Sequence, residues 1–315
     1  MPHRTFFWFI LPSALAMIVF IAMPIVSVAV QSLFVEHDRV MVSVENCGPF
    51  GCKTEMQVDY EATELLRREA PLGQYAGLST YANRNHLAFA EMAEYWRQSR
   101  GMRDFFSQLY GLPFYKALAF TLSYTAIVTP IVIVLGFTIA TAVNRLPPAA
   151  KGVAIFISLL PMIVTPLVGS LVLFWMIDAD GIIGSSLKLL MNDPGLSLKA
   201  SPTLTWLTLF VYGVWHSAPF AFVVFYAGLQ TVPQDTLESA MIDGASRWEQ
   251  IRYVVIPHLM PLATFVALIQ MMDNFRVFEP IVGFNAEASA TSLSWIIYND
   301  LNSTGAKLFS SAAAS

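Results

Sequence analysis

The sequence has few charged residues for its length. Asp, Glu, Lys and Arg make up 13% of its 315 residues, whereas 56% are hydrophobic, and the mean hydropathy is +0.57. Soluble globular proteins carry about 25% charged residues, so this composition excludes a soluble globular chain. We therefore expect an integral membrane protein.

The sequence also lacks the motifs of several protein classes. The net charge is −4 and there is no block of basic residues, which argues against a nucleic-acid partner. There is no glycine-rich phosphate-binding loop ending in Gly-Lys-Ser/Thr, no His-Glu-x-x-His motif and no paired metal-ligand spacing. We expect no cofactor and no metal to be bound by this chain. If ATP drives its activity, another chain binds the nucleotide.

Cysteine is scarce, with only Cys47 and Cys52 in the chain. They flank Gly-Pro-Phe-Gly, a turn tight enough to bring two thiols together, so we expect them to form a disulfide in an oxidising compartment. The alternative is a zinc site, for which these two residues and the distant His37 make a poor ligand set.

Long apolar runs are abundant. Residues 6–35 contain no Asp, Glu, Lys or Arg, and about 20 apolar residues suffice for a helix to cross a bilayer. The core of a secretory signal usually has about 7 to 15 residues, so we interpret residues 1–35 as a retained first transmembrane helix. Further spans are predicted at 117–144, at 152–177, within 200–234 and from 258 onward, and the final LFSSAAAS resembles the start of a sixth.

A polar insert separates the first span from the others. Residues 36–113 mix acidic and basic residues and contain both cysteines, so we expect an extramembrane subdomain. Apolar and charged residues recur at helical spacing in 62–68 and 86–103, which predicts short helices packed on the membrane face. The sequence does not indicate the function of this insert.

A charged stretch at 232–257, VPQDTLESAMIDGASRWEQIRYVVIP, lies between two apolar runs. Asp235 or Thr236 can cap a first short helix. Gly244 can end that helix in the left-handed conformation that glycine adopts without strain. The stretch is too polar to lie in lipid, so we expect it at a membrane surface.

A second helix is predicted in the same stretch. Ser246 and Glu249 have the spacing of a capping box. We expect the helix to start there and to be stopped by Pro257, because proline cannot continue a helix without a lost hydrogen bond. The stretch therefore reads as helix, turn, helix.

This pattern resembles the signature of permease subunits of binding-protein-dependent ABC importers, which reads E-A-A, three residues, G, nine residues, I-x-L-P. The corresponding residues are Glu238, Ser239, Ala240, Gly244, Val254, Ile256 and Pro257. Three of them, Ser239, Val254 and Ile256, depart from the signature. The adjacent Asp243, Gly244 and Ala245 resemble the sugar-type branch, and the N-terminal run resembles the first permease of maltose and glycerol-phosphate systems. The alternative is an amphipathic helical hairpin without a partner.

The resemblance implies an all-α, polytopic helical bundle with 114–315 as the permease core and 36–113 as an extracytoplasmic insert. It implies a non-catalytic subunit that moves a sugar or sugar-like solute across the bacterial inner membrane. The implied partners are a second permease, two cytoplasmic ATPase subunits that bind ATP and Mg, a solute-binding protein and membrane lipid. Coupling to the ATPases would involve Glu238, Ser239, Ala240, Asp243, Gly244 and Ala245.

The charge distribution gives an orientation. If the N-terminus is cytoplasmic, the basic residues of the short loops divide unequally between the two sides. Arg4, Arg145, Lys151, Arg247 and Arg252 then lie inside, against Lys188, Lys199 and Lys307 outside. This weak positive-inside bias also places the cysteines outside and the charged stretch inside.

Polar residues within the apolar runs are candidates for a solute pathway. Tyr212, Trp215, His216 and Ser217 form an aromatic and hydroxyl cluster near or somewhat beyond the middle of the fourth span. Such a cluster suits stacking against a sugar and hydrogen bonding to it. The alternative is that these residues only hold the helices together through interhelical hydrogen bonds.

A charged triplet lies near the outer end of the fifth span. Asp273, Arg276 and Glu279 are spaced by three residues, so we expect them along one side of a helix, facing the protein interior or the pathway. The alternative is an ion pair at the membrane rim.

Three other function classes are considered. An ion-driven secondary transporter is compatible with acids in a span, but no internal repeat is evident. A membrane scaffold that anchors a complex is the second. An intramembrane enzyme would need a nucleophile with a base at helical spacing, and neither His216 nor Ser170 has such a partner in the sequence.

Overall fold

The computed structural model describes residues 2–37, 39–48, 51–193, 195, 197–199, 201–302 and 309–314, with side chains described for all of these except 2–5, 46–48 and 51–55. The chain divides into two compact units. One comprises residues 1–115 and 296–315, and the other comprises residues 116–295.

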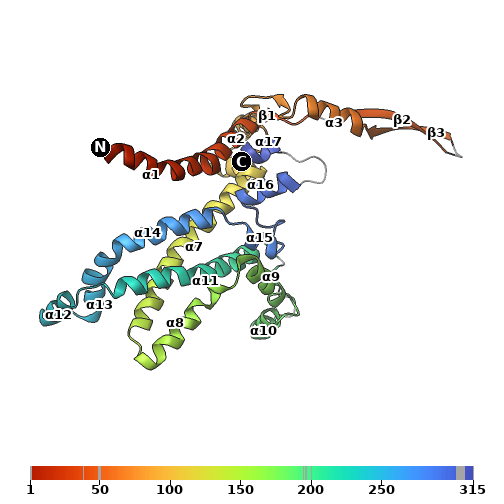
Figure 1. The fold of residues 1–315 in the computed structure, drawn as a ribbon. Helices are drawn as coiled ribbons and strands as arrows, with labels where there is room; N and C mark the ends of the chain where they lie inside the picture. Colours follow the sequence, from red (N-terminus) through yellow and green to blue (C-terminus); the bar gives the residue numbers. More distant parts are fainter. Residues whose placement is uncertain are drawn as a thin grey trace. The chain divides into compact units, whose positions relative to one another are not determined.

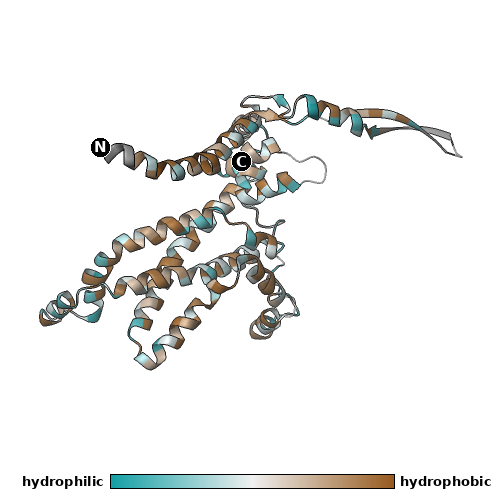
Figure 2. Ribbon diagram, in the orientation of Figure 1, coloured by the Kyte–Doolittle hydropathy of each residue, from teal (hydrophilic) through white to brown (hydrophobic). Residues whose placement is uncertain are grey.

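Helices dominate the described chain (Figure 1). Four of them are long and apolar enough to cross a bilayer: Phe6–Gln31, Pro113–Asn144, Pro202–Leu229 and Arg247–Phe275. A bent pair, Pro148–Ile163 with Pro166–Met176, gives a fifth crossing if it counts as one span. Figure 2 shows the hydrophobic residues along these helices. The prediction of an all-α polytopic membrane protein is confirmed.

The first unit begins with the N-terminal span. It consists of α1 (Pro2–Met17), a π-helical turn (Ile18–Ala22) and α2 (Met23–Gln31). None of its most apolar stretch is buried within the chain. A helix that is apolar on all sides requires lipid or another subunit around it, which agrees with the predicted first span.

Three long helices form the core of the second unit. They are α7 (Pro113–Asn144), α11 (Pro202–Leu229) and α14 (Ile256–Phe275). α7 and α11 approach closely at Gly136, where an added Cβ would lie 2.5 Å from the Cβ of Ala221. Only a residue without a side chain permits this packing.

The predicted third span, 152–177, is not one continuous helix. α8 (Pro148–Ile163) and α9 (Pro166–Met176) are bent by 93° relative to each other. Between them Val164 and Thr165 are extended, with ψ of 127° and 145°. The break coincides with Pro166, because the residue before a proline is biased away from the helical conformation.

The prediction that Pro257 stops a helix is wrong. A π-helical turn, Ile251–Val255, leads directly into α14, so the helix is continuous across the proline. In this turn the N–H of Ile256 donates to the carbonyl of Ile251. Proline normally clashes with the carbonyl four residues earlier, and the wider turn just before Pro257 accommodates it.

The insert contains short helices, as predicted, in the first unit. They are α3 (Tyr60–Glu69), α4 (Ser79–Ala82), α5 (Phe89–Gln98) and α6 (Met102–Leu109). Asp59 caps α3, since its Oδ1 accepts the N–H of Ala62 at 3.0 Å.

The insert also contains strands that the sequence did not predict. β2 (Met41–Gly48) and β3 (Gly51–Val58) form an antiparallel hairpin, while β1 (Phe34–Val35) pairs with β4 (Gln74–Tyr75). The hairpin register places Cys47 opposite Cys52. Their side chains lie outside the described part of the chain, so the disulfide stays a prediction.

The remaining helices are α10 (Ile182–Met191), α15 (Glu279–Gly283), α16 (Leu293–Asn302) and α17 (Phe309–Ala314). α17 occupies the position of the predicted sixth span. Within the first unit, the carboxylate of Glu36 accepts the N–H of Ser310 at 3.0 Å. The insert is thereby bonded to the start of α17.

Candidate functional site

The charged stretch folds as two short helices, as predicted. α12 (Gln234–Ile242) and α13 (Arg247–Gln250) flank a turn, and α13 continues into the fifth span. The expectation that Asp235 or Thr236 caps α12 is wrong. The helix starts directly after Pro233, which has no capping side chain, so both residues lie within its first turn.

Gly244 ends α12 in the left-handed conformation, with φ of 81°. The N–H of Gly244 donates to the carbonyl of Met241 at 3.1 Å, and the N–H of Ala245 donates to that of Ala240 at 2.9 Å. These two bonds form a Schellman motif, in which glycine is favoured because it has no Cβ. The predicted left-handed helix end at Gly244 is confirmed.

The start of α13 is fixed equally well. The N–H of Ser246 donates to Glu249 Oε2 at 2.7 Å, and the N–H of Glu249 donates to Ser246 Oγ at 3.3 Å. This is the predicted capping box. Gln250 Nε2 also donates to the Ala245 carbonyl at 2.9 Å. The turn between the two helices is therefore set by bonds to its own residues.

Polar contacts join the end of α11, just before the charged stretch, to α7 and α14. At the C-terminus of α11, Gln230 Nε2 donates to Asn144 Oδ1 of α7 at 3.0 Å. The next residue, Thr231, shares a hydrogen bond with His258 Nε2 of α14 at 3.1 Å. The end of α11 that leads into α12 is therefore bonded to α7 and α14, and α13 continues directly into the fifth span.

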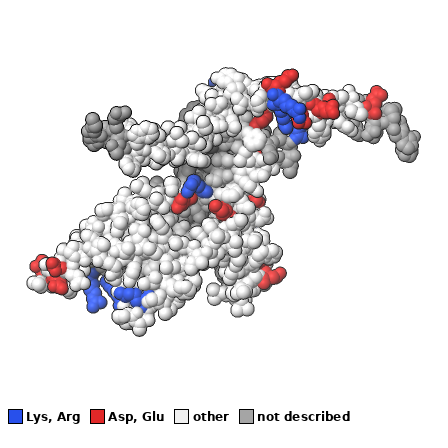
Figure 3. Space-filling model, viewed as in Figure 1, with Lys and Arg blue, Asp and Glu red and all other residues white. Residues whose placement is uncertain are grey.

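The predicted coupling residues lie on a surface that the chain itself does not cover. Glu238, Ser239, Asp243 and Gly244 are exposed, and Ala240 and Ala245 are partly exposed. Figure 3 shows acidic side chains gathered at the α12 end of the unit, with basic side chains nearby.

Large apolar side chains share this surface, which the sequence interpretation missed. Met241, Ile242, Trp248 and Tyr253 are all exposed, and Ile242 is 86% exposed. Large apolar side chains exposed on a segment too polar for lipid are candidates for contact with another protein. The sequence signal that could have identified these exposed apolar residues is the position of Ile242 and Trp248 on either side of the predicted turn.

The fourth span contacts the break between α8 and α9. Tyr212 Oη donates to the carbonyl of Pro166 at 2.7 Å, and His216 Nε2 donates to the carbonyl of Val164 at 3.2 Å. These two carbonyls lie where the helix is interrupted, so side-chain donors compensate for the missing helical bonds. The interhelical hydrogen bonds foreseen as the alternative role of this cluster are therefore present.

The cluster is also aromatic, as predicted. The Tyr212 ring lies 6.0 Å from Trp215, 5.8 Å from His216 and 5.6 Å from Phe284, between centroids. Tyr212 is buried, Trp215 is exposed, and His216 and Ser217 are partly exposed. The Tyr212 hydroxyl is hydrogen-bonded to a carbonyl at the break between α8 and α9, whereas the Trp215 ring is exposed.

Two buried amides in the fifth span were missed. Gln270 and Asn274, one turn apart on α14, are each 4% exposed. Asn274 Nδ2 donates to Thr129 Oγ1 of α7 at 3.0 Å, whereas Gln270 Oε1 has no hydrogen-bond partner in the described part of the chain. Buried polar groups in a span are costly and tend to be functional. The sequence signal that could have identified these two amides is their i, i+4 spacing within an apolar run.

The charged triplet is only partly as predicted. Arg276 NH2 pairs with Asp273 Oδ1 at 3.0 Å, and both side chains are more than half exposed. The three residues do not share one helix side, because α14 ends at Phe275 and Glu279 begins α15. The spacing was correct, but the helix it presupposed ends before Arg276.

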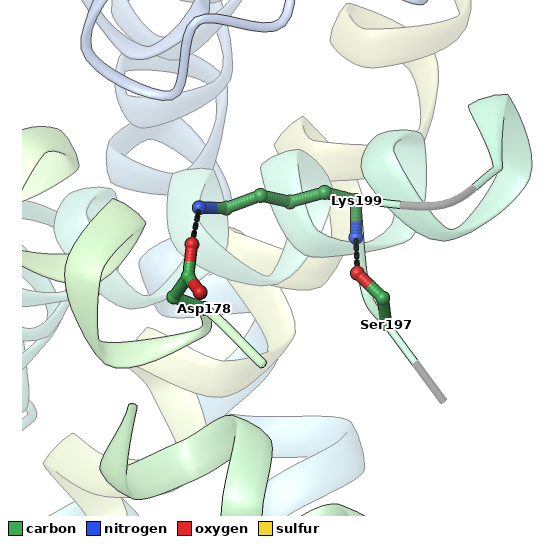
Figure 4. A network of polar contacts seen from close by, with 3 residues as sticks. All are labelled: Asp178, Ser197 and Lys199. Carbon is green, nitrogen blue, oxygen red and sulfur yellow. Dashed lines mark hydrogen bonds and ion pairs between the residues drawn. The ribbon is translucent and has the colours of Figure 1, made fainter. Parts of the chain in front are cut away.

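A further ion pair closes the loop after α9. Lys199 Nζ donates to Asp178 Oδ2 at 2.7 Å (Figure 4). The same Nζ lies 3.3 Å from the centroid of the Phe174 ring. The Lys199 N–H also donates to Ser197 Oγ at 3.4 Å. The hydrogen bond and charge of Lys199 lower the pKa of Asp178 below its usual value.

This pair predicts acid-sensitive loop closure. Because the pKa of Asp178 is lowered in the folded chain, the stabilisation is present at neutral pH and is lost as pH falls through that lowered pKa. Limited proteolysis of residues 178–199 in nanodiscs should be slow at neutral pH and fast in acid. Lys199→Met should remove the pH dependence and leave the loop fast at both pH values, whereas Lys188→Met serves as the control.

Comparison with known proteins agrees with this geometry. Residues 113–278, slightly more than half of the chain, match the family model described as "Binding-protein-dependent transport system inner membrane component". The match covers the long helices of the core and the whole charged stretch. The structure is also similar to a chain of a bacterial alginate ABC transporter crystallised with an alginate-bound periplasmic protein, with a TM-score of 0.55, 21% identity, and coverage of 72% and 80% of the two chains. At that identity the likeness concerns the fold.

Several named relatives have similar sequences. The trehalose/maltose transport system permease protein MalF of Thermococcus litoralis is 28% identical over 64% of this chain and 69% of its own length. The trehalose transport system permease protein SugA of Mycobacterium tuberculosis is 29% identical over 64% of each chain. The span order, the turn at Gly244 and the family match lead to one conclusion: the chain belongs to the binding-protein-dependent transport system inner membrane components.

Proposed function

We propose that this chain is the permease subunit of an ABC importer for a sugar or sugar-like solute, coupled to a separate ATPase through α12 and α13. The observation that carries the proposal is the exposed helix–turn–helix between the fourth and fifth spans. The names of the relatives, which refer to trehalose and maltose transport, support the sugar class. The proposed location is the bacterial inner membrane with a cytoplasmic N-terminus.

The coupling proposal follows from rigidity and exposure. The bonds around Gly244 and Ser246 fix the angle between α12 and α13, and the unit is joined to α7 and α14 through Gln230 and Thr231. An ATPase that binds α12 could therefore move three spans at once. Glu238 would offer a carboxylate to a basic residue of the ATPase, and Ile242 would enter an apolar recess.

The proposed assembly contains a second permease, two ATPase subunits that hold ATP and Mg, and an extracytoplasmic binding protein. Co-purification from membranes tests it. The full chain should retain an ATPase subunit, and Ile242→Asp should release it while leaving the chain in the membrane. An ion-driven transporter or a scaffold gives different results: the first would transport the solute without the ATPase, and the second would hold partners without transport.

The proposed solute pathway involves Trp215, His216 and Ser217 on α11, with Tyr212 setting the aromatic wall. The charged residues Asp273, Arg276 and Glu279 are proposed to lie near its outer mouth. Gln270 is included in the proposed pathway because its buried Oε1 lacks a protein partner in the described chain. This oxygen would accept a hydrogen bond from a hydroxyl group of the solute. ATPase closure would expose these residues alternately to the two sides of the membrane.

Gln270 and Asn274 provide a matched test of the pathway. Gln270→Leu should leave the stability of the chain unchanged or higher, because it removes a buried oxygen without a partner. It should also weaken solute uptake, raising the apparent KM by roughly 5- to 100-fold for one lost hydrogen bond. Asn274→Leu should instead lower stability by about 1 kcal/mol.

Solute uptake and thermal unfolding of both variants in nanodiscs or proteoliposomes separate these roles. Unchanged uptake by Gln270→Leu would remove Gln270 from the pathway. Unchanged stability of Asn274→Leu would show that its bond to Thr129 contributes nothing to the packing of α7 against α14.

A further inference from the structure

The last part of the insert is a helical hairpin with an unusual exposed face. α5 and α6 are joined at Ser99–Gly101 and lie in the first unit, immediately before α7 begins at Pro113. Met102 and Phe106 on α6 are 59% and 56% exposed, although both are large and apolar.

α6 is strongly two-sided. Met102, Phe105, Phe106, Leu109 and Tyr110 share one side at i, i+3 and i, i+4 spacing. The opposite side carries Arg103, Asp104, Ser107 and Gln108. Its polar residues Arg103, Asp104 and Ser107 are also exposed. A helix exposed on both sides, one apolar and one polar, fits a boundary between two solvents.

α5 extends the same apolar face. Phe89 and Trp96, seven residues apart, are 50% and 62% exposed. The Trp96 ring lies edge-on against Phe105 of α6 at 5.3 Å between centroids, and Phe105 lies 5.6 Å from Phe106. The rings of Trp96, Phe105 and Phe106 therefore form one continuous aromatic cluster across the two helices.

Both ends of the hairpin are joined to the start of α7. Three residues, 110–112, connect α6 to α7, and Leu112 is 1% exposed. At the other end, Tyr115 Oη of the first turn of α7 donates to the carbonyl of Leu87 at 2.9 Å, just before α5 begins. The hairpin is thus joined at both ends to the first residues of α7.

Charge completes the pattern. Arg97, Arg100 and Arg103 lie around the α5–α6 turn, and all three are exposed. None of them takes part in an ion pair within the described residues. Arginines beside exposed Trp, Tyr and Phe are the composition of a membrane interface, where the rings enter the headgroup region and the guanidinium groups meet lipid phosphates.

We infer that α5 and α6 form an interfacial anchor that lays Phe89, Trp96, Met102 and Phe106 into the phospholipid surface, with Arg97, Arg100 and Arg103 binding lipid phosphates. This assigns a ligand class to a part of the insert whose role the sequence left open. The inference depends on α7 being a membrane span and does not depend on the coupling role of α12. The anchor would hold the insert and its β2–β3 hairpin at a fixed height above the membrane.

Photolabelling by lipid tests the anchor. The full chain is reconstituted in nanodiscs that contain phosphatidylcholine or phosphatidylglycerol carrying a photoreactive group near the glycerol, and adducts are mapped by mass spectrometry. We expect adducts on the peptides of α5 and α6, with α7 as the internal positive control. Adducts on α7 together with unlabelled α5 and α6 would overturn the inference, whatever the behaviour of any variant.

Variants test the apolar contact with lipid and the phosphate contact separately. Met102→Ser with Phe106→Ser should reduce labelling of α6 severalfold, whereas Leu65→Ser on α3, an exposed leucine on another helix of the insert, should change nothing. Arg100→Gln with Arg103→Gln should lower the preference for phosphatidylglycerol over phosphatidylcholine by about two- to fivefold. An unchanged preference would contradict phosphate binding by these arginines.

A protein partner is the competing occupant of this face. A photoreactive amino acid at position 106 in the assembled complex distinguishes the two outcomes. Crosslinks to lipid support the anchor. Crosslinks to another permease or to a binding protein, with loss of lipid labelling on assembly, would overturn it.

Discussion

Gly244→Val is expected to abolish solute uptake while leaving the chain folded and in the membrane. Gly244 has φ of 81°, and an added Cβ would meet no atom within 4 Å. The cost is therefore conformational rather than steric, of order 1 to 2 kcal/mol for a side chain in the left-handed region. A β-branched residue relieves that strain by opening the Schellman bonds, which changes the angle between α12 and α13.

The measurement is ATPase activity of the reconstituted complex, with and without binding protein and ligand. In the variant, hydrolysis should no longer respond to loaded binding protein, or the ATPase should dissociate. Gly152→Val is the matched control, because a Cβ there also meets open space but the residue is helical. Gly244→Asn should retain part of the coupling, since asparagine tolerates the left-handed conformation.

Glu238→Lys tests the same surface by charge. Glu238 is exposed on α12, so reversal of its charge should not disturb the fold, yet it should repel a basic residue on the ATPase. Full stimulation by loaded binding protein in both Glu238→Lys and Gly244→Val would leave α12 and α13 as an ordinary cytoplasmic loop and would remove the basis for the coupling proposal.

The coupling stretch could be predicted from sequence because its determinants are local. Gly244, Ser246 and Glu249 act through bonds to residues within five positions, and the spacing of those residues is readable in a single chain. The long spans were predicted for a related reason: lipid imposes length and apolarity on each helix separately. Neither prediction requires knowledge of which segments meet in space.

The errors arose where conformation depends on neighbours or on small backbone changes. Pro257 and Pro166 are both prolines in apolar runs, yet the first is accommodated by a π-helical turn and the second breaks its helix by 93°. The sequence does not distinguish them, because the broken helix is supported by Tyr212 and His216 from a distant segment. The end of α14 at Phe275, which places Asp273 and Glu279 on different helices, likewise has no signal in the sequence.

The insert shows a different limit. Residues 41–48 pair with residues 51–58, but their mixed polar and apolar sequence lacks clear alternation, so no strand was predicted there. The helices at 60–69 and 89–98 were foreseen because their apolar residues recur at helical spacing, whereas most of α6 lies beyond the predicted segment 86–103. Buried amides such as Gln270 carry no charge and do not interrupt an apolar run, although an uncharged amide is also costly to bury in a span.

Tyr212→Phe is expected to destabilise the break between α8 and α9. The Tyr212 hydroxyl is the donor to the Pro166 carbonyl at 2.7 Å, and a helix broken within a membrane has no water to replace it. Loss of one partner of a buried hydrogen bond costs about 1 to 3 kcal/mol. His216→Leu should add a similar loss at Val164, so the double variant should unfold at clearly lower temperature than either single variant.

These residues are also pathway candidates, so stability and transport must be measured together. Thermal unfolding in nanodiscs reports on the break, and the KM for uptake reports on solute contact. Trp215→Phe is the control, because its exposed ring lies beside Tyr212 and no bond to the break is assigned to it. We expect Tyr212→Phe to lower stability and Trp215→Phe to preserve it. If Tyr212→Phe instead raised KM without any loss of stability, the hydroxyl would be serving the solute, and the support of the break would have to come from His216 alone.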